Sequence, residues 1–114
     1  MFGLFRKKKN KEIANAVADL RYLEIASDSL KLVRSTLNPK TFFGRCDDIV
    51  AAEERLTGTS TFEDDLDVQT ALQIELIDRV IAAGRKDMFK ASMADYEWRL
   101  TPDAMMYYVM KIDD

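Results

Sequence analysis

The apolar residues between positions 13 and 37 recur with a helical period, and this pattern limits the possible folds more than any other feature. They follow one another at steps of three or four residues: Ile13, Ala16, Leu20, Leu23, Ala26, Leu30, Val33 and Leu37. Residues with that spacing line one side of an α-helix. A helix from about residue 10 to residue 37 would be about 42 Å long at 1.5 Å per residue. We expect it to be the longest element of the molecule.

Capping patterns divide the rest of the chain into further helices. Asn38-Pro39 predicts the start of a second helix, because proline suits the first helical position and disfavours the α conformation in the residue before it. Ser60-Thr61-Phe62-Glu63 has the capping-box pattern of a third helix, which Gly84 would end. Asp87 is expected to cap a fourth helix, and Thr101-Pro102 a fifth.

No segment alternates with period two, so strands are not expected. The predicted fold is all-α: a four- to five-helix, mostly antiparallel bundle with a long first helix. The helical period predicts core positions on the second helix (Phe42, Cys46, Ile49, Leu56), the third (Phe62, Leu66, Leu72, Leu76, Ile77, Val80, Ala83) and the fourth (Phe89, Met93, Tyr96, Leu100).

Composition excludes several classes of enzyme. The chain has 114 residues, 47% of them hydrophobic, and a net charge of -3, which is typical of one globular domain. It contains no histidine, so the imidazole-based triads, the common zinc sites and the Glu-x-x-His di-iron sites are absent. The single cysteine, Cys46, lies on an apolar stripe and is interpreted as buried filler. We therefore expect no enzymatic activity, no cofactor and no small-molecule substrate.

Charge separates a basic arm, residues 1–11, from a helical domain, residues 12–114. The arm holds five basic residues and no acidic one, whereas the remainder holds 12 basic and 20 acidic residues, a net charge of -8. Three interpretations of this arm remain open: it is a solvated terminus, it binds an anionic membrane surface, or it contacts the phosphates of a nucleic acid. Nucleic acid is the least favoured, because the acidic domain would repel it. The candidate contact residues are Phe2, Phe5, Arg6, Lys7, Lys8 and Lys9.

The segment from Ala104 to Met110 consists of seven apolar or aromatic residues in a row. A helix of that composition is apolar on every side, so it is either buried centrally or covered by another chain. Methionine and tyrosine both suit contact surfaces. The candidate protein interface, which a homodimer could use, consists of Met105, Met106, Tyr108 and Met110.

Acidic residues form local clusters that do not define a metal or catalytic site. Glu63-Asp64-Asp65-Leu66-Asp67 lacks the spacing and glycine of a calcium loop and suits the positive end of a helix dipole. Asp47-Asp48 and Glu53-Glu54 are adjacent pairs, and neighbours on a helix point about 100° apart. These pairs are therefore interpreted as a solvated face.

The segment from Ser35 to Ile49 reads Ser-Thr-Leu-Asn-Pro-Lys-Thr-Phe-Phe-Gly-Arg-Cys-Asp-Asp-Ile. It resembles a Thr-x-Asn-Pro-x-x-Phe-Phe-x-Arg-x-Asp segment that follows a long helix in uncharacterised helical proteins of Gram-positive bacteria and their phages. The resemblance implies a bacterial or prophage origin. It implies no activity and no functional residues.

These features favour a non-catalytic helical protein-interaction module that binds a protein partner or a second copy of itself. Two alternatives remain open. One is a phage- or mobile-element-type acidic inhibitor that occupies a nucleic-acid-binding site of a host protein. The other is a peripheral membrane adaptor that uses the basic arm. No apolar run reaches the ~20 residues of a membrane span, so the expected location is cytoplasmic or membrane-peripheral.

Overall fold

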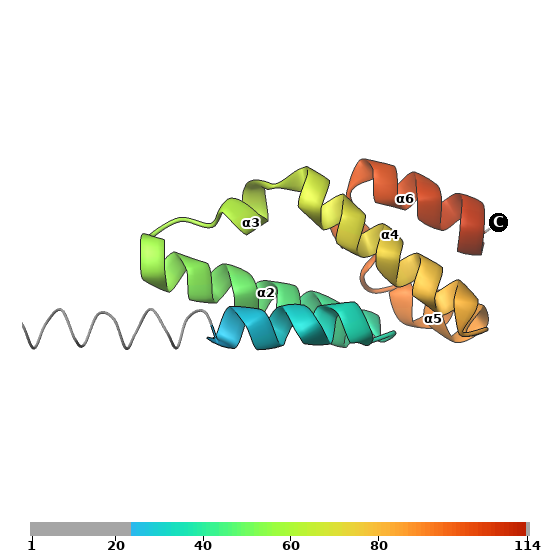
Figure 1. Ribbon diagram of the computed structural model, residues 1–114. Helices are drawn as coiled ribbons and strands as arrows, with labels where there is room; N and C mark the ends of the chain where they lie inside the picture. Colours follow the sequence, from blue (N-terminus) through green and yellow to red (C-terminus); the bar gives the residue numbers. More distant parts are fainter. Residues whose placement is uncertain (1–23, 114) are drawn as a thin grey trace, which may run out of the picture.

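The computed structural model describes residues 24–113, and within that range every regular element is helical (Figure 1). A first helix covers residues 24–35. It is followed by α2 (Pro39–Thr57), α3 (Thr61–Asp64), α4 (Leu66–Ala82), α5 (Lys86–Met93), the 3-10 helix η1 (Glu97–Arg99), α6 (Pro102–Tyr108) and the π-helix η2 (Val109–Asp113). The all-α prediction is confirmed. The expectations for the basic arm and for the first half of the long helix lie outside the described residues.

The junction between the first helix and α2 has the predicted chemistry. The first helix ends at residue 35, two residues before its predicted end. Asn38 then caps α2, because its side-chain oxygen accepts hydrogen bonds from the backbone N–H groups of Lys40 at 2.9 Å and Thr41 at 3.4 Å. Pro39 occupies the first turn, where its missing N–H costs nothing.

The predicted third helix is two helices, because the chain bends at Asp65. Ser60 caps α3 as predicted, accepting a hydrogen bond from the Glu63 N–H at 3.0 Å. The Asp65 side chain then accepts from the Val68 N–H at 3.1 Å and so caps α4. A short carboxylate that bonds its neighbouring backbone competes with helix continuation, which explains the break. Gly84 ends α4 as predicted, with a φ of 68°.

The segment after Gly84 departs from its prediction at two points. Arg85 occupies the cap position of α5 but forms no capping hydrogen bond with its side chain, and Asp87 lies in the first turn instead of capping the helix. The helix also stops at Met93, so that Tyr96 and Leu100 flank the separate helix η1. Thr101 caps α6 as predicted, accepting from the Ala104 N–H at 3.4 Å.

The core is built around α4, which lies between α6 on one side and α2 and α5 on the other in Figure 1. Its buried members are Val33, Phe42, Phe43, Leu72, Leu76, Ile77, Val80, Phe89, Met93, Tyr108 and Ile112. The predicted core positions Leu56 and Leu66 are wrong, with exposed fractions of 41% and 59%, and Ala83 is exposed as well. All three lie at or next to the ends of helices. None of the described helices carries an apolar stretch that could cross a bilayer.

Candidate functional site

A groove opens where α2, α3, α4 and η1 meet, and we name it the Trp98 groove. Its volume is about 270 Å³. The side chains that line it combine aromatic, amide and charged groups: Phe43, Cys46, Asp47, Val50, Phe62, Glu63, Gln69, Gln73, Trp98 and Arg99. Segments separated by up to 56 residues of sequence therefore contribute to one surface.

Arg99 is fixed at the centre of this groove. Its guanidinium donates two hydrogen bonds to the Asp47 carboxylate, at 2.9 and 2.5 Å. The same guanidinium lies 4.9 Å from the ring centroid of Phe43 and 5.6 Å from that of Trp98. The hydrogen bonds with Asp47 raise the pKa of Arg99, so the guanidinium stays charged at neutral pH.

Trp98 is 79% exposed, the largest exposed fraction among the large apolar side chains described. Its indole N–H donates a hydrogen bond to the Asp95 carbonyl at 3.1 Å, which satisfies the polar atom of the ring. What remains in contact with water is the apolar surface of the ring. Tryptophan and arginine are two of the residue types that are enriched among energetically dominant interface residues.

Two glutamines hold the walls of the groove together. Gln69 donates to the carbonyls of Phe62 at 2.8 Å and Glu63 at 2.6 Å, which ties α3 to α4. Gln73 is buried, and it donates to the Arg99 carbonyl at 3.4 Å while it accepts from the Thr101 N–H at 2.9 Å. Both amides are therefore committed to structure and are not free to bind a small molecule.

Cys46 forms part of the groove wall but is not a nucleophile. Burial raises the pKa of its thiol to about 12; Arg99 acts against this shift and Asp47 adds to it. The thiol is accordingly protonated at neutral pH, whereas nucleophilic attack needs a thiolate. This agrees with the interpretation of Cys46 as filler. In the described residues, no three histidine, cysteine or acidic side chains come close enough to hold a metal ion.

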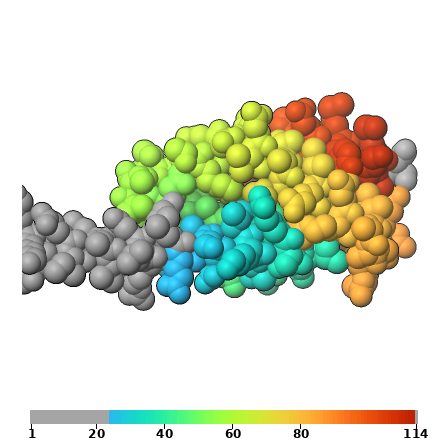
Figure 2. Space-filling view, in the orientation of Figure 1, coloured from blue at the N-terminus to red at the C-terminus, as the bar shows by residue number. Residues whose placement is uncertain are grey.

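Negative charge is concentrated at the same end of the molecule as the groove. Residues 47–67, which we name the acidic end, contain eight acidic residues and one basic residue, a net charge of -7. The other described residues contain nine acidic and ten basic side chains, a net charge of +1. The acidic end comprises most of α2, all of α3 and the start of α4, the green segments in Figure 1 and Figure 2. Its exposed apolar side chains are Leu56 and Leu66.

The predicted interface on the C-terminal helix is only partly exposed. Tyr108 is fully buried, with its ring 6.1 Å from that of Phe89, so its assignment to an outward-facing surface is wrong. The reason is that α6 packs on α4, which covers this side of the helix. Met105 is half-buried against the core, whereas Met106 and Met110 are 65% and 64% exposed. A contact through the two exposed methionines stays a prediction.

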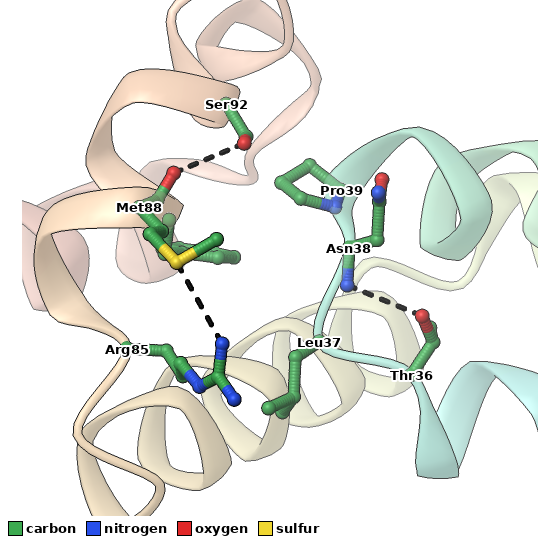
Figure 3. Close-up of a pocket in the computed structure, with 8 residues that line it drawn as sticks. Thr36, Leu37, Asn38, Pro39, Arg85, Met88 and Ser92 are labelled. Carbon is green, nitrogen blue, oxygen red and sulfur yellow. Dashed lines mark hydrogen bonds between the residues drawn. The ribbon is translucent and has the colours of Figure 1, made fainter.

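A second pocket, of about 260 Å³, lies between the turn at residues 36–39 and α5 (Figure 3). It includes Asn38 and Pro39, which belong to the segment that resembles proteins of Gram-positive bacteria and their phages. Its polar atoms are used within the fold: the Asn38 N–H donates to the Thr36 hydroxyl at 3.1 Å, and the Ser92 hydroxyl donates to the Met88 carbonyl at 3.0 Å. No set of polar groups converges on the space between them.

The sequence did not identify the Trp98 groove. The adjacent pair Trp98-Arg99 was its available signal, since both residue types favour interfaces. The membrane or phosphate contacts expected at Phe2, Phe5 and residues 6–9 lie outside the described residues. Comparison with known proteins identifies no relative, because no protein family, no curated protein and no solved structure matches this chain.

Proposed function

We propose that this protein is a non-catalytic helical interaction module that binds a basic, partly apolar protein segment in the Trp98 groove. In this proposal the helices form a four- to five-helix, mostly antiparallel bundle, of bacterial or prophage origin, that acts in the cytoplasm. The observation that carries the proposal is the 79% exposure of Trp98 in a groove next to the acidic end.

The energetics of Trp98 support a binding role. An aromatic side chain buries about 150–250 Å² when fully covered. At about 25 cal/mol per Å², covering most of the indole ring contributes roughly 3 kcal/mol to association. Arg99 is already held by Asp47 and Phe43, so a partner that covers Trp98 need not order it first.

The charges define the chemistry of the partner. Glu63 lines the groove beside the ion pair of Asp47 and Arg99, and the groove adjoins an acidic end with a net charge of -7. A cationic segment is attracted to such a surface and an anionic one is repelled. Phe62 and Trp98 require apolar side chains in the same segment. Lysine or arginine combined with leucine or phenylalanine satisfies both conditions.

A synthetic peptide of leucine and lysine, fluorescently labelled, is a direct probe of this surface. We expect the full chain to bind it with micromolar affinity, and Trp98→Ala to weaken binding about a hundredfold, equivalent to about 2.8 kcal/mol. Met110→Ala, which removes another exposed apolar side chain, serves as the matched control and should bind as the wild type does. Equal affinities for Trp98→Ala and the wild type would contradict the proposal.

The charge distribution favours a second candidate, the acidic inhibitor that occupies a nucleic-acid-binding site of a host protein. An acidic mimic depends on charge and not on Trp98, and its affinity falls steeply with salt. The variant Glu54→Gln/Asp64→Asn/Asp67→Asn removes three exposed charges that form no hydrogen bond or ion pair among the described residues. If this variant abolishes peptide binding while Trp98→Ala leaves it unchanged, the second candidate replaces the first.

A further inference from the structure

We infer that the occupant of the Trp98 groove is the basic arm, residues 1–11, of a second copy of this chain. The inference rests on the proposed function, because it takes the groove as the docking surface and names what binds there. It turns the module into a protein that associates with itself by exchanging arms.

The arm has the chemistry that the groove requires. It carries five basic residues and no acidic one, against a net charge of -7 at the acidic end. Its apolar residues, Phe2, Leu4 and Phe5, directly precede the basic run. The groove offers aromatic side chains, Phe62 and Trp98, beside the carboxylate of Glu63, and it opens onto the other carboxylates of the acidic end. Charge and apolar surface are therefore complementary between these two parts of one sequence.

The arm is long enough to cover the groove and part of the acidic end. Eleven extended residues span up to about 36–40 Å. The part of α2 that belongs to the acidic end, residues 47–57, is about 15 Å long at 1.5 Å per residue. An arm of this length can cover the groove and continue along the neighbouring carboxylates of α2 and α3.

The path of the chain favours a groove on a second copy. The described chain begins at residue 24 in a helix drawn beside α2 (Figure 1). The apolar stripe runs from Ile13 to Val33 without a break in its spacing, so the sequence predicts that this helix starts near residue 10. Residue 11 would then lie about 20 Å from residue 24 along the helix axis. To reach its own groove, the arm would have to double back along such a helix and use about half of its extended length to do so.

Exchange of arms between two copies also produces a closed dimer. If the arm of each copy binds the groove of the other, the contacts are reciprocal and a two-fold dimer results. All docking surfaces are then used, and no open chain of copies grows from them.

Trp98 is the only tryptophan of the chain and lines the groove, so its fluorescence reports directly on whether the groove is covered. We expect the emission of the full chain to shift to the blue between about 5 and 500 µM, the range in which a micromolar dimer forms. Acrylamide quenching should fall about twofold as the indole ring leaves water. The mass from light scattering should double over the same range, and salt at about 0.5 M should reverse both changes.

The test variant is Lys7→Glu/Lys8→Glu/Lys9→Glu in the full chain. It should stay monomeric, with Trp98 exposed at every concentration. The matched control, Lys31→Glu/Lys40→Glu/Lys86→Glu, changes the net charge equally at exposed positions outside the arm and should behave as the wild type does. Phe2→Ser/Phe5→Ser removes the apolar contacts without changing charge, and it should also weaken the dimer.

Three results would overturn the inference. Shielding of Trp98 that depends on the arm but not on concentration would place the arm in the groove of its own chain. Equal behaviour of the arm variant and the wild type would remove the arm from the groove altogether. Arm-dependent binding to phosphatidylserine vesicles, with no concentration-dependent change at Trp98, would assign the arm to a membrane surface. In each case the leucine-lysine peptide decides the proposed function separately, through its dependence on Trp98.

Discussion

At the scale of single residues, Tyr108 combines complete burial with a hydroxyl that has no hydrogen-bond partner among the described residues. Burial raises the pKa of Tyr108 to about 12, because the phenolate loses its hydration, and the carboxylates of Glu97 and Asp113 act in the same direction. The raised pKa has a consequence for folding. The protonated Tyr108 side chain contributes to the free energy of unfolding. This contribution is complete below the ordinary pKa of 10.0, and it is lost as the pH rises from about 10 towards 12.

Tyr108→Phe tests this assignment. At pH 7 the variant should be as stable as the wild type or up to about 1 kcal/mol more stable, since it removes an unpaired buried hydroxyl. Between pH 10 and 12 it should lose less stability than the wild type. The loss that remains belongs in part to Cys46, whose pKa of about 12 lies above its ordinary value of 9.0. Urea denaturation at a series of pH values measures both effects, and parallel pH curves would refute the assignment.

Local signals predicted the capping residues, and they did so because the interaction partners are close in sequence. Asn38, Ser60 and Thr101 each bond a backbone N–H two or three residues further on. The pair of Arg99 and Asp47 could not be predicted in this way, because the partners are 52 residues apart. Their meeting depends on how η1 lies against α2, which no local pattern specifies.

At the scale of elements, Arg79 connects α4 to the end of the first helix. Its guanidinium donates hydrogen bonds to the carbonyls of Thr36 at 2.9 Å and Val33 at 3.0 Å. These carbonyls lie at the C-terminal end of a helix, where acceptors lack helical partners and the dipole favours a positive charge. Burial lowers the pKa of Arg79, but the guanidinium remains charged at any ordinary pH.

We expect Arg79→Met to lower the free energy of unfolding by about 2 kcal/mol, because it leaves two acceptors without their charged donor. Methionine keeps most of the apolar length of the side chain, so the change isolates the hydrogen bonds. Arg34→Met, at an exposed position on the first helix itself, is the matched control and should change stability by less than about 0.5 kcal/mol. Equal losses in the two variants, measured by urea denaturation, would show that Arg79 does not join these elements.

The element boundaries that were predicted wrongly share a physical cause. Asp65 lies inside a sequence whose apolar period continues through it, yet its side chain caps α4 and ends α3. Asp87 has the right composition for a cap, yet α5 begins before it. An aspartate can cap a helix or lie within its first turn, and the choice depends on neighbouring elements. The period of the apolar residues correctly predicted that these segments are helical, but it did not predict the residues at which the helices begin and end.

At the scale of the whole molecule, the negative charge and the exposed methionines of the C-terminal segment lie on different elements. The acidic end holds more than the entire net charge of the described residues, whereas Met106 and Met110 lie on α6 and η2. The acidic residues and the apolar C-terminal run could both be recognised in the sequence. Where they lie relative to one another could not. It also overestimated the exposure of the C-terminal helix, because the run from Ala104 to Met110 does not reveal which side packs on α4.

This distribution leads to a prediction that separates two possible dimers. Met106→Glu/Met110→Glu changes two side chains that are 65% and 64% exposed, so the variant should keep its helical circular dichroism signal and its melting temperature. If arms and grooves hold the dimer, its mass at high concentration should remain that of two chains. The two methionines offer a narrow apolar strip, because Tyr108 is buried and Met105 is half-buried. A variant that stays folded but whose mass halves would instead place the dimer contact on the C-terminal helix.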